Sequence, residues 1–241
     1  MNEQITYPIR INRYLYLKNI CSRRKADELI EKGHIKVNGK KAVLGQKINS
    51  GDNVEVDNTV KQIAQNYEYY VFNKPVGVVS HNPQNNEKAV EDFFKNIKYK
   101  KLSPVGRLDK DSEGLMLLTN DGRIIDKMLN PKYEHEKEYI VKVDKDLKES
   151  FARKMSKGVK IEGYITKPSK CIVIGPRSFR IILTEGKKHQ IRRMTVALGY
   201  QVKQLKRTRI MNLRLNNLPK GTSRKIDPEE KIGLLKLIGL Q

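Results

Sequence analysis

The segment best suited to chemistry in this chain runs from Gly106 to Gly122, where a carboxylate and an arginine precede an apolar run. Asp109 and Arg107 are two positions apart, and the uncharged stretch Leu115 to Thr119 is typical of a short buried strand. Loops carried on a rigid strand often hold catalytic groups. We therefore expect Asp109 to be held in a pocket. The alternative is a carboxylate that caps a turn or pairs with Arg107 at the surface, as most isolated Arg-x-Asp motifs do.

The charge of the chain indicates its class of partner. Of 241 residues, 49 are Lys or Arg and 27 are Asp or Glu, which gives a formal net charge of +22 and a pI near 9.9. Such a basic protein attracts polyanions through the release of condensed counterions. Residues 186–226 hold twelve Lys or Arg and no acidic residue, so they supply +12 of the +22. This acid-free segment is expected to contact RNA.

The cysteines, the histidines and the hydropathy of the chain argue against a secreted, a metal-binding and a membrane-spanning protein. Cys21 and Cys171 are far apart without a neighbouring ligand pattern, so we expect ordinary thiols in a reducing cytosol. The four histidines have no metal-ligand spacing, and no metal site is expected. The N-terminus lacks the apolar core of a signal peptide, and no apolar run approaches the roughly 20 residues that cross a bilayer. A cytoplasmic protein without membrane contact is expected.

Residues 8–57 have the pattern of a self-contained unit. Ser22 is placed as the N-cap of a helix that Gly33 ends. Asn38-Gly39 is a two-residue hairpin signal. Strands are expected at residues 35–37, 41–43 and 54–56.

Three cations, Arg23, Arg24 and Lys25, crowd the first turn of that helix. Cations at a helix N-terminus oppose the helix dipole, so helix stability is a poor explanation for them. Phosphate binding is a better one.

A polar linker is expected at residues 58–66, followed by a domain of mixed strands and helices at residues 67–241. The strands and helices do not alternate strictly, which favours a mixed, largely antiparallel sheet flanked by helices over a doubly wound one. The sequence therefore predicts an α+β protein. In this domain we expect strands at 69–72, 115–119, 139–143, 172–174 and 179–183, and helices near 87–97, 123–129, 146–157 and 189–198.

Three motifs of the larger domain resemble those of the bacterial rRNA pseudouridine synthases, the RsuA/RluB/RluE/RluF family. GRLDKDSEGLMLLTNDG at 106–122 resembles the central signature, VFNKPVG at 71–77 the first motif and EGKKHQIRRM at 185–194 the third. SRRKADELIEKGHIKVNGK at 22–40 is similar to the S4 RNA-binding domain. These motifs, in the right order behind an S4-like unit, span nearly the whole chain. The runs at 135–139 and 206–212 are most similar to the RluF members.

The resemblance implies that the protein isomerises a specific uridine of RNA to pseudouridine. The N-glycosidic bond breaks, the base turns, and the base rejoins the ribose through carbon. Nothing is oxidised and no group is lost, so no cofactor is expected. Asp109 is implied as the reacting carboxylate, which either adds covalently or assists departure of the base. Large-subunit ribosomal RNA is the favoured partner, with a tRNA as an additional substrate, and the protein is expected to be a monomer.

The resemblance also implies roles for other residues. A buried carboxylate must be kept ionised by an opposite charge or by hydrogen bonds, and Arg192 matches the arginine that does this. Arg193 is the neighbouring candidate, and the alternative for either arginine is phosphate binding. Tyr139 matches a tyrosine that stacks on uracil and takes part in proton transfer, the alternative being a core aromatic. Arg107 matches the side chain that fills the gap left by the extruded nucleotide. Lys74 is expected to be structural or phosphate-binding. We expect RNA positioning by Arg23, Arg24, Lys25, Lys187, Lys188, Arg193, Lys206, Arg207 and Arg209.

Two other classes of function stay open. A non-catalytic RNA-binding assembly factor is disfavoured because Asp109, Tyr139 and Arg192 are all present. A glycosidase acting on RNA needs two carboxylates, and Asp111 or Glu113 stands close enough in sequence to join Asp109. A methyltransferase is disfavoured because no glycine-rich fingerprint follows the early strands.

Overall fold

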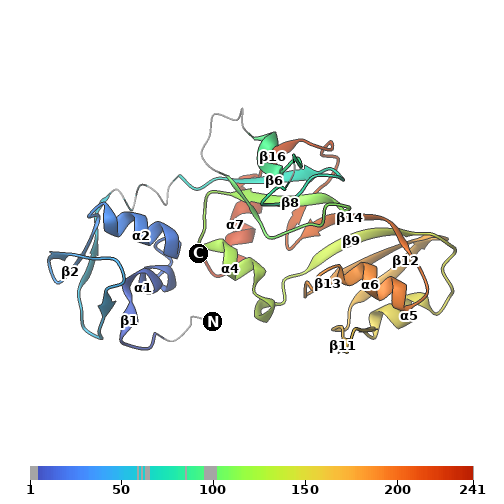
Figure 1. Cartoon of the computed structure of the whole chain (residues 1–241), viewed down its shortest axis with the longest axis horizontal. Helices are drawn as coiled ribbons and strands as arrows, with labels where there is room; N and C mark the ends of the chain where they lie inside the picture. Colours follow the sequence, from blue (N-terminus) through green and yellow to red (C-terminus); the bar gives the residue numbers. More distant parts are fainter. Residues whose placement is uncertain are drawn as a thin grey trace.

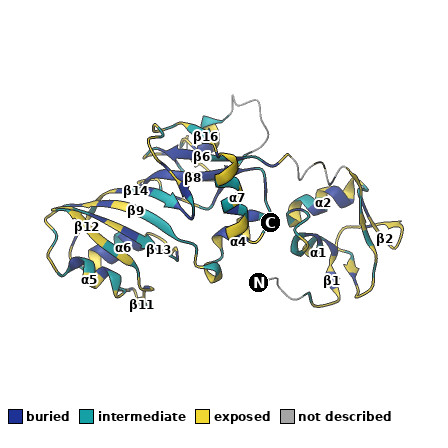
Figure 2. Cartoon of the chain, turned by 180° about the vertical axis from the view of Figure 1, so that it is seen from behind, coloured by how far each residue is buried: buried dark blue, intermediate teal, exposed yellow. Residues whose placement is uncertain are grey.

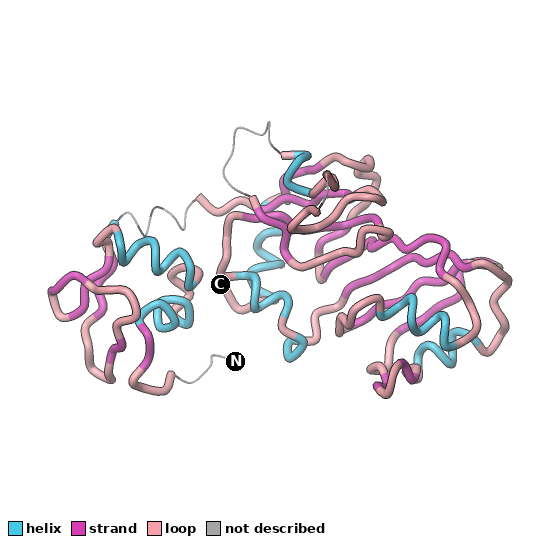
Figure 3. The backbone as a smooth tube through the Cα atoms, viewed as in Figure 1, coloured by secondary structure: helices cyan, strands magenta, loops and turns pink. Residues whose placement is uncertain are grey.

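The computed structural model describes residues 5–58, 60, 62, 66–84, 86–94 and 102–240. Figure 1 shows a small N-terminal unit beside a larger part that is built on a long twisted sheet. Figure 3 shows that the larger part is built mainly around strands, with short helices packed against them.

The N-terminal unit packs two helices, α1 (Ile11–Leu17) and α2 (Arg23–Glu31), against short strands. Ser22 caps α2 as predicted, because its hydroxyl oxygen accepts a hydrogen bond from the Lys25 amide at 3.2 Å. Asn38 and Gly39 have φ values of 51° and 78°, as a two-residue hairpin turn requires. The strands are β1 (Ile9–Arg10), β2 (Ile35–Val37), β3 (Lys40–Lys41), β4 (Lys47–Ile48) and β5 (Val54–Val56), in the pairings β1-β4 and β3-β2-β5.

Helix α1 was not predicted, although Ile11 and Leu15 are spaced as one apolar helical face. Both side chains are buried, together with Ala26, Leu29 and Ile30 of α2, in the core of the N-terminal unit. The apolar residues at 9, 11, 15 and 17 fit the spacing of a strand as well as that of a helix. The sequence pattern therefore did not identify this short helix. The strand expected at 41–43 is shorter and earlier, as β3.

The larger part is organised round a nine-stranded sheet of order β12-β13-β9-β14-β8-β6-β16, with β15 paired to β14 and β7 to β8. Its only parallel pair among the described residues is β8 with β14; the other pairs are antiparallel. The mixed, largely antiparallel sheet is thereby confirmed. The strands are β6 (Tyr69–Lys74), β7 (Ser103–Val105), β8 (Glu113–Thr119), β9 (Lys137–Val143), β12 (Lys170–Gly175), β13 (Ser178–Leu183), β14 (Val202–Ile210), β15 (Leu213–Arg214) and β16 (Ser223–Lys225).

The helices cover opposite faces of the two halves of this sheet. Gly114 of β8 is in register with Arg207 of β14, and Arg207 is in register with Tyr139 of β9, so these three positions share one face. Leu115 faces the other way and packs with α4 (Ile124–Leu129) and α7 (Pro228–Leu237). Val141, on the Tyr139 face, packs with α5 (Phe151–Ser156) and α6 (Gln190–Ala197). Figure 2 shows β6 and β8 coloured almost wholly as buried, whereas β9, β12 and β14 also carry exposed residues.

Several predicted elements differ from those in the structure. The helix expected near 87–97 is a 3-10 turn, η1 (Val90–Phe93), and residues 95–97 lie outside the described part of the chain. The helix expected at 146–157 begins only at Phe151. Strand β14 and helix α7 were not predicted. No helix in the described ranges is both long and apolar enough to span a bilayer.

The N-terminal unit contacts the turn that follows β8. Arg123 donates from Nη1 to the carbonyl oxygen of Asn19 at 3.0 Å, and it pairs with Asp121 at 2.7 Å. The Arg123 guanidinium also lies 4.4 Å from the ring centre of Tyr67. Of the predicted linker, residues 59, 61 and 63–65 lie outside the described part of the chain.

Candidate active site

Asp109 lies on the loop of residues 106–112 between β7 and β8, which we term the Asp109 loop. The main chain of this loop is firmly held: the Ser112 amide donates to the Asp109 carbonyl at 3.0 Å, and the Gly77 amide donates to Lys110 O at 2.8 Å. The Ser80 hydroxyl donates to Leu108 O at 2.7 Å and accepts from the Leu108 amide at 3.0 Å. The side chain of Asp109 is nevertheless 35 % exposed. The loop is rigid while its carboxylate stays reachable.

Two residues at the start of α6 approach the Asp109 loop. His189 Nε2 lies 3.6 Å from Asp109 Oδ1. Arg192 donates from Nη2 to the Asp111 carbonyl at 2.8 Å and lies 3.5 Å from Ser112 Oγ. The predicted ion pair between Arg192 and Asp109 is therefore replaced by a bond to the main chain of the loop. The contact of His189 was missed, although its place in the HQIRR run was the available signal.

Tyr139 lies in β9, partly buried, and packs against the cluster that contains Leu108, the neighbour of Asp109. The same side chain also packs against the core beneath α5 and α6. Arg107 is exposed, and within the described ranges its side chain has no hydrogen bond or ion pair. The structure thus brings Asp109, Tyr139, Arg107 and Arg192 to one region.

Arg207 departs from its predicted contact with RNA. Its side chain is buried, with the residue only 4 % exposed, and it donates to two main-chain carbonyls, those of Leu115 and Arg107. The sequence placed it in a basic run, but the pleat of β14 turns alternate residues inward. A side chain in this position is not available to a phosphate.

The other predicted RNA contacts divide into cations that are paired with a carboxylate and cations that are exposed. Paired ones are Arg209 with Glu136 at 2.9 Å, Arg193 with Glu162 at 2.6 Å and Lys25 with Glu28 at 2.9 Å. The side chain of Arg209 is only 11 % exposed, so the predicted contact of Arg209 with an RNA phosphate does not fit its position. The exposed ones are Arg23, Arg24, Lys187 and Lys188, with Lys206 partly exposed.

A basic hollow in the N-terminal unit was missed. It has a volume of about 320 Å³ and is lined by four cations, Arg10, Arg13, Arg23 and Lys47. Of these only Arg23 was singled out, because the other three are scattered in the sequence and converge only in the fold.

Lys74, at the end of β6, is fully buried and structural. Its ammonium donates to Val78 O at 2.7 Å and Pro75 O at 2.9 Å, and it lies 3.5 Å from Lys110 O in the Asp109 loop. The pKa of Lys74 is lowered to about 8, first by burial and then by the charge of Arg207, although the charges of Asp109, Asp111 and Glu113 oppose this shift. Two buried cations therefore lie close to the carboxylates of this loop.

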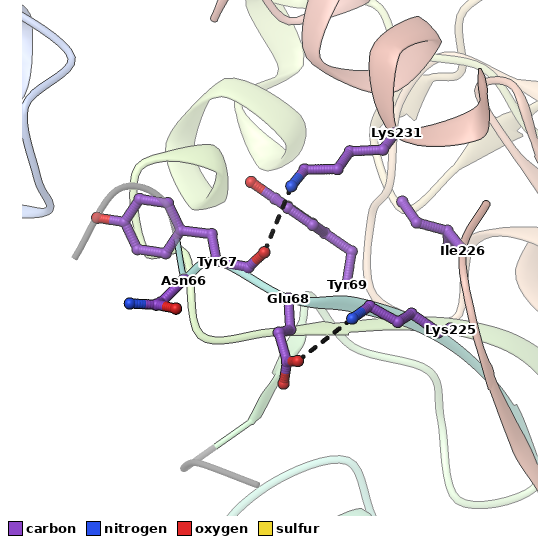
Figure 4. A pocket seen from close by; sticks show the side chains of 7 residues that line it. All are labelled: Asn66, Tyr67, Glu68, Tyr69, Lys225, Ile226 and Lys231. Carbon is purple, nitrogen blue, oxygen red and sulfur yellow. Dashed lines mark hydrogen bonds and ion pairs between the residues drawn. The ribbon is translucent and has the colours of Figure 1, made fainter. Parts of the chain in front are cut away.

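A second hollow lies at the opposite end of β6 from this region. It has a volume of about 260 Å³, and Figure 4 shows the ion pair of Glu68 and Lys225 at its edge, 3.3 Å apart. None of the sequence-predicted site residues lines it. Among the described residues, no group of three or more His, Cys, Asp or Glu side chains is arranged to hold a metal ion.

Both parts of the chain match families of known proteins. The family model described as RNA pseudouridylate synthase matches residues 68–197, and the S4 domain model matches residues 9–54. The dual-specificity RNA pseudouridine synthase RluF of Escherichia coli K12 is 44 % identical over 232 residues, which cover 95 % of this chain and 79 % of that protein. Ribosomal large subunit pseudouridine synthase B of Bacillus subtilis 168 is 38 % identical, covering 92 % and 93 % of the two chains. A crystal structure of a pseudouridylate synthase superimposes with a TM-score of 0.68 at 28 % identity, covering 94 % and 99 %.

Proposed function

We propose that this chain, which belongs to the RNA pseudouridylate synthase family, uses the Asp109 carboxylate to isomerise a specific uridine of large-subunit ribosomal RNA. It is an RNA pseudouridine synthase with an S4 domain in front of the synthase domain. The residue assignments and the choice of RNA are the proposal. We assign RNA recruitment to residues 8–57, a linker to 58–66 and chemistry to 67–241.

The observation that carries the proposal is the position of Asp109 on a loop held through its main chain. The hydrogen bonds of the loop leave the carboxylate partly exposed, and the one basic side chain within 4.0 Å of it among the described residues is the imidazole of His189. A carboxylate that serves as a reacting group must be fixed in place and open to substrate. Asp109 meets both requirements.

In the reaction, the bond from ribose C1′ to uracil N1 breaks and a bond from C1′ to C5 forms. The proton on C5 is lost and N1 is protonated, so the product is an isomer of the substrate. The Asp109 carboxylate either adds covalently or assists departure of the base. Tyr139, which packs against the cluster that contains Leu108, stacks on the turned base and takes part in proton transfer. Exposed Arg107 fills the space of the extruded nucleotide. All these groups come from one chain, so a monomer suffices.

Large-subunit ribosomal RNA is proposed as the substrate because the Bacillus subtilis relative is named for that subunit. The Escherichia coli relative is named as dual-specificity, which supports a second RNA substrate, and we propose that this second substrate is a tRNA. RNA binds through the exposed cations Arg23, Arg24, Lys187 and Lys188.

The experiment compares the wild-type protein, Asp109→Asn and Asp111→Asn on large-subunit RNA and tRNA transcripts, with carbodiimide mapping of pseudouridine. Asp109→Asn is expected to abolish pseudouridine formation while RNA affinity and the far-UV spectrum stay unchanged, because an amide matches a carboxylate in size but neither attacks nor accepts a proton. Asp111→Asn is the matched control on the same loop and should stay active.

Three outcomes oppose the proposal. Activity of Asp109→Asn within tenfold of wild type removes Asp109 from the mechanism. Release of free uracil that depends on Asp111 indicates a glycosidase instead. Tight RNA binding without any product from wild type favours the assembly factor.

A further inference from the structure

Arg207 joins the two ends of the segment that carries Asp109. Its Nε donates to Leu115 O at 2.7 Å, and its Nη1 donates to Arg107 O at 3.2 Å. One acceptor precedes Asp109 by two residues and the other lies in β8, beyond the loop. A single rigid guanidinium therefore holds both ends of the loop at a fixed separation.

The sheet places Arg207 directly beneath this segment. Arg207 is in parallel register with Gly114 and in antiparallel register with Tyr139, so it lies between the strand that leaves the Asp109 loop and the strand that carries the tyrosine. A Cβ at Gly114 would lie 2.3 Å from the Arg207 carbonyl oxygen and 2.8 Å from its amide nitrogen. The two main chains approach so closely only because residue 114 is glycine.

Stability alone is a poor explanation for an arginine here. A buried guanidinium is normally paired with a carboxylate, as Arg123 is with Asp121 at 2.7 Å. Among the described residues none forms an ion pair with Arg207, although its position is only 4 % exposed, and its Nη2 is buried without a hydrogen-bond partner. Its two acceptors both belong to the segment that carries Asp109. The burial of the Arg207 guanidinium is therefore unfavourable in itself, and its two hydrogen bonds fix the segment that carries Asp109.

We propose that Arg207 is a positioning residue that holds the Asp109 carboxylate in its reactive place through the main chain of the loop. The inference rests on the proposed role of Asp109. A neutral or shorter side chain at 207 leaves RNA binding intact but allows the loop to open, so the carboxylate is less often in place. Arg207 itself does not touch the substrate.

The test uses Arg207→Gln and Arg207→Lys in the full-length protein. Leu213→Ala is the matched stability control: Leu213 is fully buried and pairs with the end of β14, at Ile210, away from the loop. Three quantities are measured for each protein: amide hydrogen exchange of the peptide spanning 106–115, the affinity for the RNA transcript, and the single-turnover rate at saturating RNA.

We expect Arg207→Gln to speed exchange in 106–115 by at least about tenfold and to slow the single-turnover rate by at least about tenfold, the loss of roughly one charge-assisted hydrogen bond. RNA affinity should stay within about threefold, because Arg207 is buried. The loop exchange and the single-turnover rate of Arg207→Lys should lie between those of wild type and Arg207→Gln, since one ammonium does not reproduce the two donors that the guanidinium holds in fixed geometry. Leu213→Ala should lower the melting temperature without changing either loop exchange or the single-turnover rate.

The proposal is overturned if Arg207→Gln keeps both the exchange protection of 106–115 and the single-turnover rate of wild type. It is likewise overturned if Leu213→Ala, at an equal loss of melting temperature, loses as much loop protection and rate as Arg207→Gln. It is also overturned if affinity and rate fall together. If Arg207→Gln does not fold, Arg207→Lys decides by the same criteria. Failure of wild type to form pseudouridine would refute the proposed function instead, and the exchange of 106–115 would still decide whether Arg207 holds the loop.

Discussion

Arg192 and Asp111 are joined by a hydrogen bond of 2.8 Å, from the guanidinium Nη2 to the main-chain carbonyl oxygen. The arginine thereby reaches the Asp109 loop two residues beyond the carboxylate that it was expected to neutralise. Its Nη1 lies 3.5 Å from Val202 O, at the start of β14. Arg192 thus links α6, the loop and β14.

Arg192→Met is expected to slow the single-turnover rate by roughly 10- to 100-fold, because a hydrogen bond from a charged donor is worth about 1.5–3 kcal/mol and orients the loop. RNA affinity should change by less than about threefold. Quenched single-turnover assays measure the rate, and filter binding measures the RNA affinity. The neighbour Arg193→Met, whose guanidinium is paired with Glu162 instead, is the control and should keep its rate. Equal losses of affinity and rate in Arg192→Met would identify a phosphate contact.

Much of the fold could be predicted because its strands are strongly patterned. The run Leu115 to Thr119 is uncharged and lies wholly in the buried strand β8. Strand β14 was missed because Lys206, Arg207 and Arg209 interrupt its apolar residues, so the segment looked like a surface run of charge. Its inward cations find carbonyl and carboxylate partners from distant parts of the chain, which no local pattern shows.

The site was predictable in its members but not in its contacts. The motifs indicated Asp109, Tyr139 and Arg192, and the fold brings them together. Whether an arginine meets a carboxylate or a carbonyl depends on differences of a few ångströms between α6 and the loop, which spacing in sequence does not encode. The role of Arg207 depends in addition on the register of β8 with β14, a pairing between residues 93 positions apart.

The N-terminal unit should contribute mainly electrostatic binding. Changing Arg23, Arg24 and Lys25 to Ala is expected to flatten the slope of log affinity against log salt by about 1.4 to 1.8 units, since each of two phosphate contacts contributes roughly 0.7 to 0.9. Two phosphate contacts rather than three are expected because Lys25 is paired with Glu28. The slope is measured by filter binding between low and moderate salt, and the single-turnover rate at saturating RNA should stay within a few fold.

The control for this triple variant removes the same charge elsewhere. Lys148, Lys154 and Lys157 are exposed around α5, and their replacement by Ala should change the slope by less than half as much. An unchanged slope in the first variant, or a collapse of its rate at saturation, would contradict an RNA anchor on α2.

Gly114→Ala should destabilise the protein by more than about 2 kcal/mol, because the new Cβ has no room beside β14 and the backbone strain adds to the clash. The glycine has a φ of 112°, and the Cβ would lie 2.3 Å from the carbonyl oxygen of Arg207. Gly175→Ala is the control: its nearest neighbour would be Ser178 Cβ at 3.8 Å, and the loss should stay within roughly 1 kcal/mol. Urea unfolding measures both. Equal stabilities of the two variants would mean that β8 and β14 do not need this close approach.

Lys74 should make stability depend on pH in a defined window. Burial lowers its pKa from 10.5 to about 8 in the folded protein, so below pH 8 both states are protonated and the cost of burying the charge is constant. Between about pH 8 and 10.5 the unfolded chain keeps the proton that the folded protein loses, so the free energy of unfolding gains up to about 1.4 kcal/mol per pH unit from this group. Urea unfolding of wild type and Lys74→Met at pH 7, 8, 9 and 10 should show a difference in the free energy of unfolding that is flat below pH 8 and then grows in favour of wild type.

Lys110→Met is the control, since the bond to Glu87 raises the pKa of Lys110, and removal of a group with a raised pKa produces no such growth. Parallel curves for wild type and Lys74→Met across the whole range would show that Lys74 keeps an ordinary pKa.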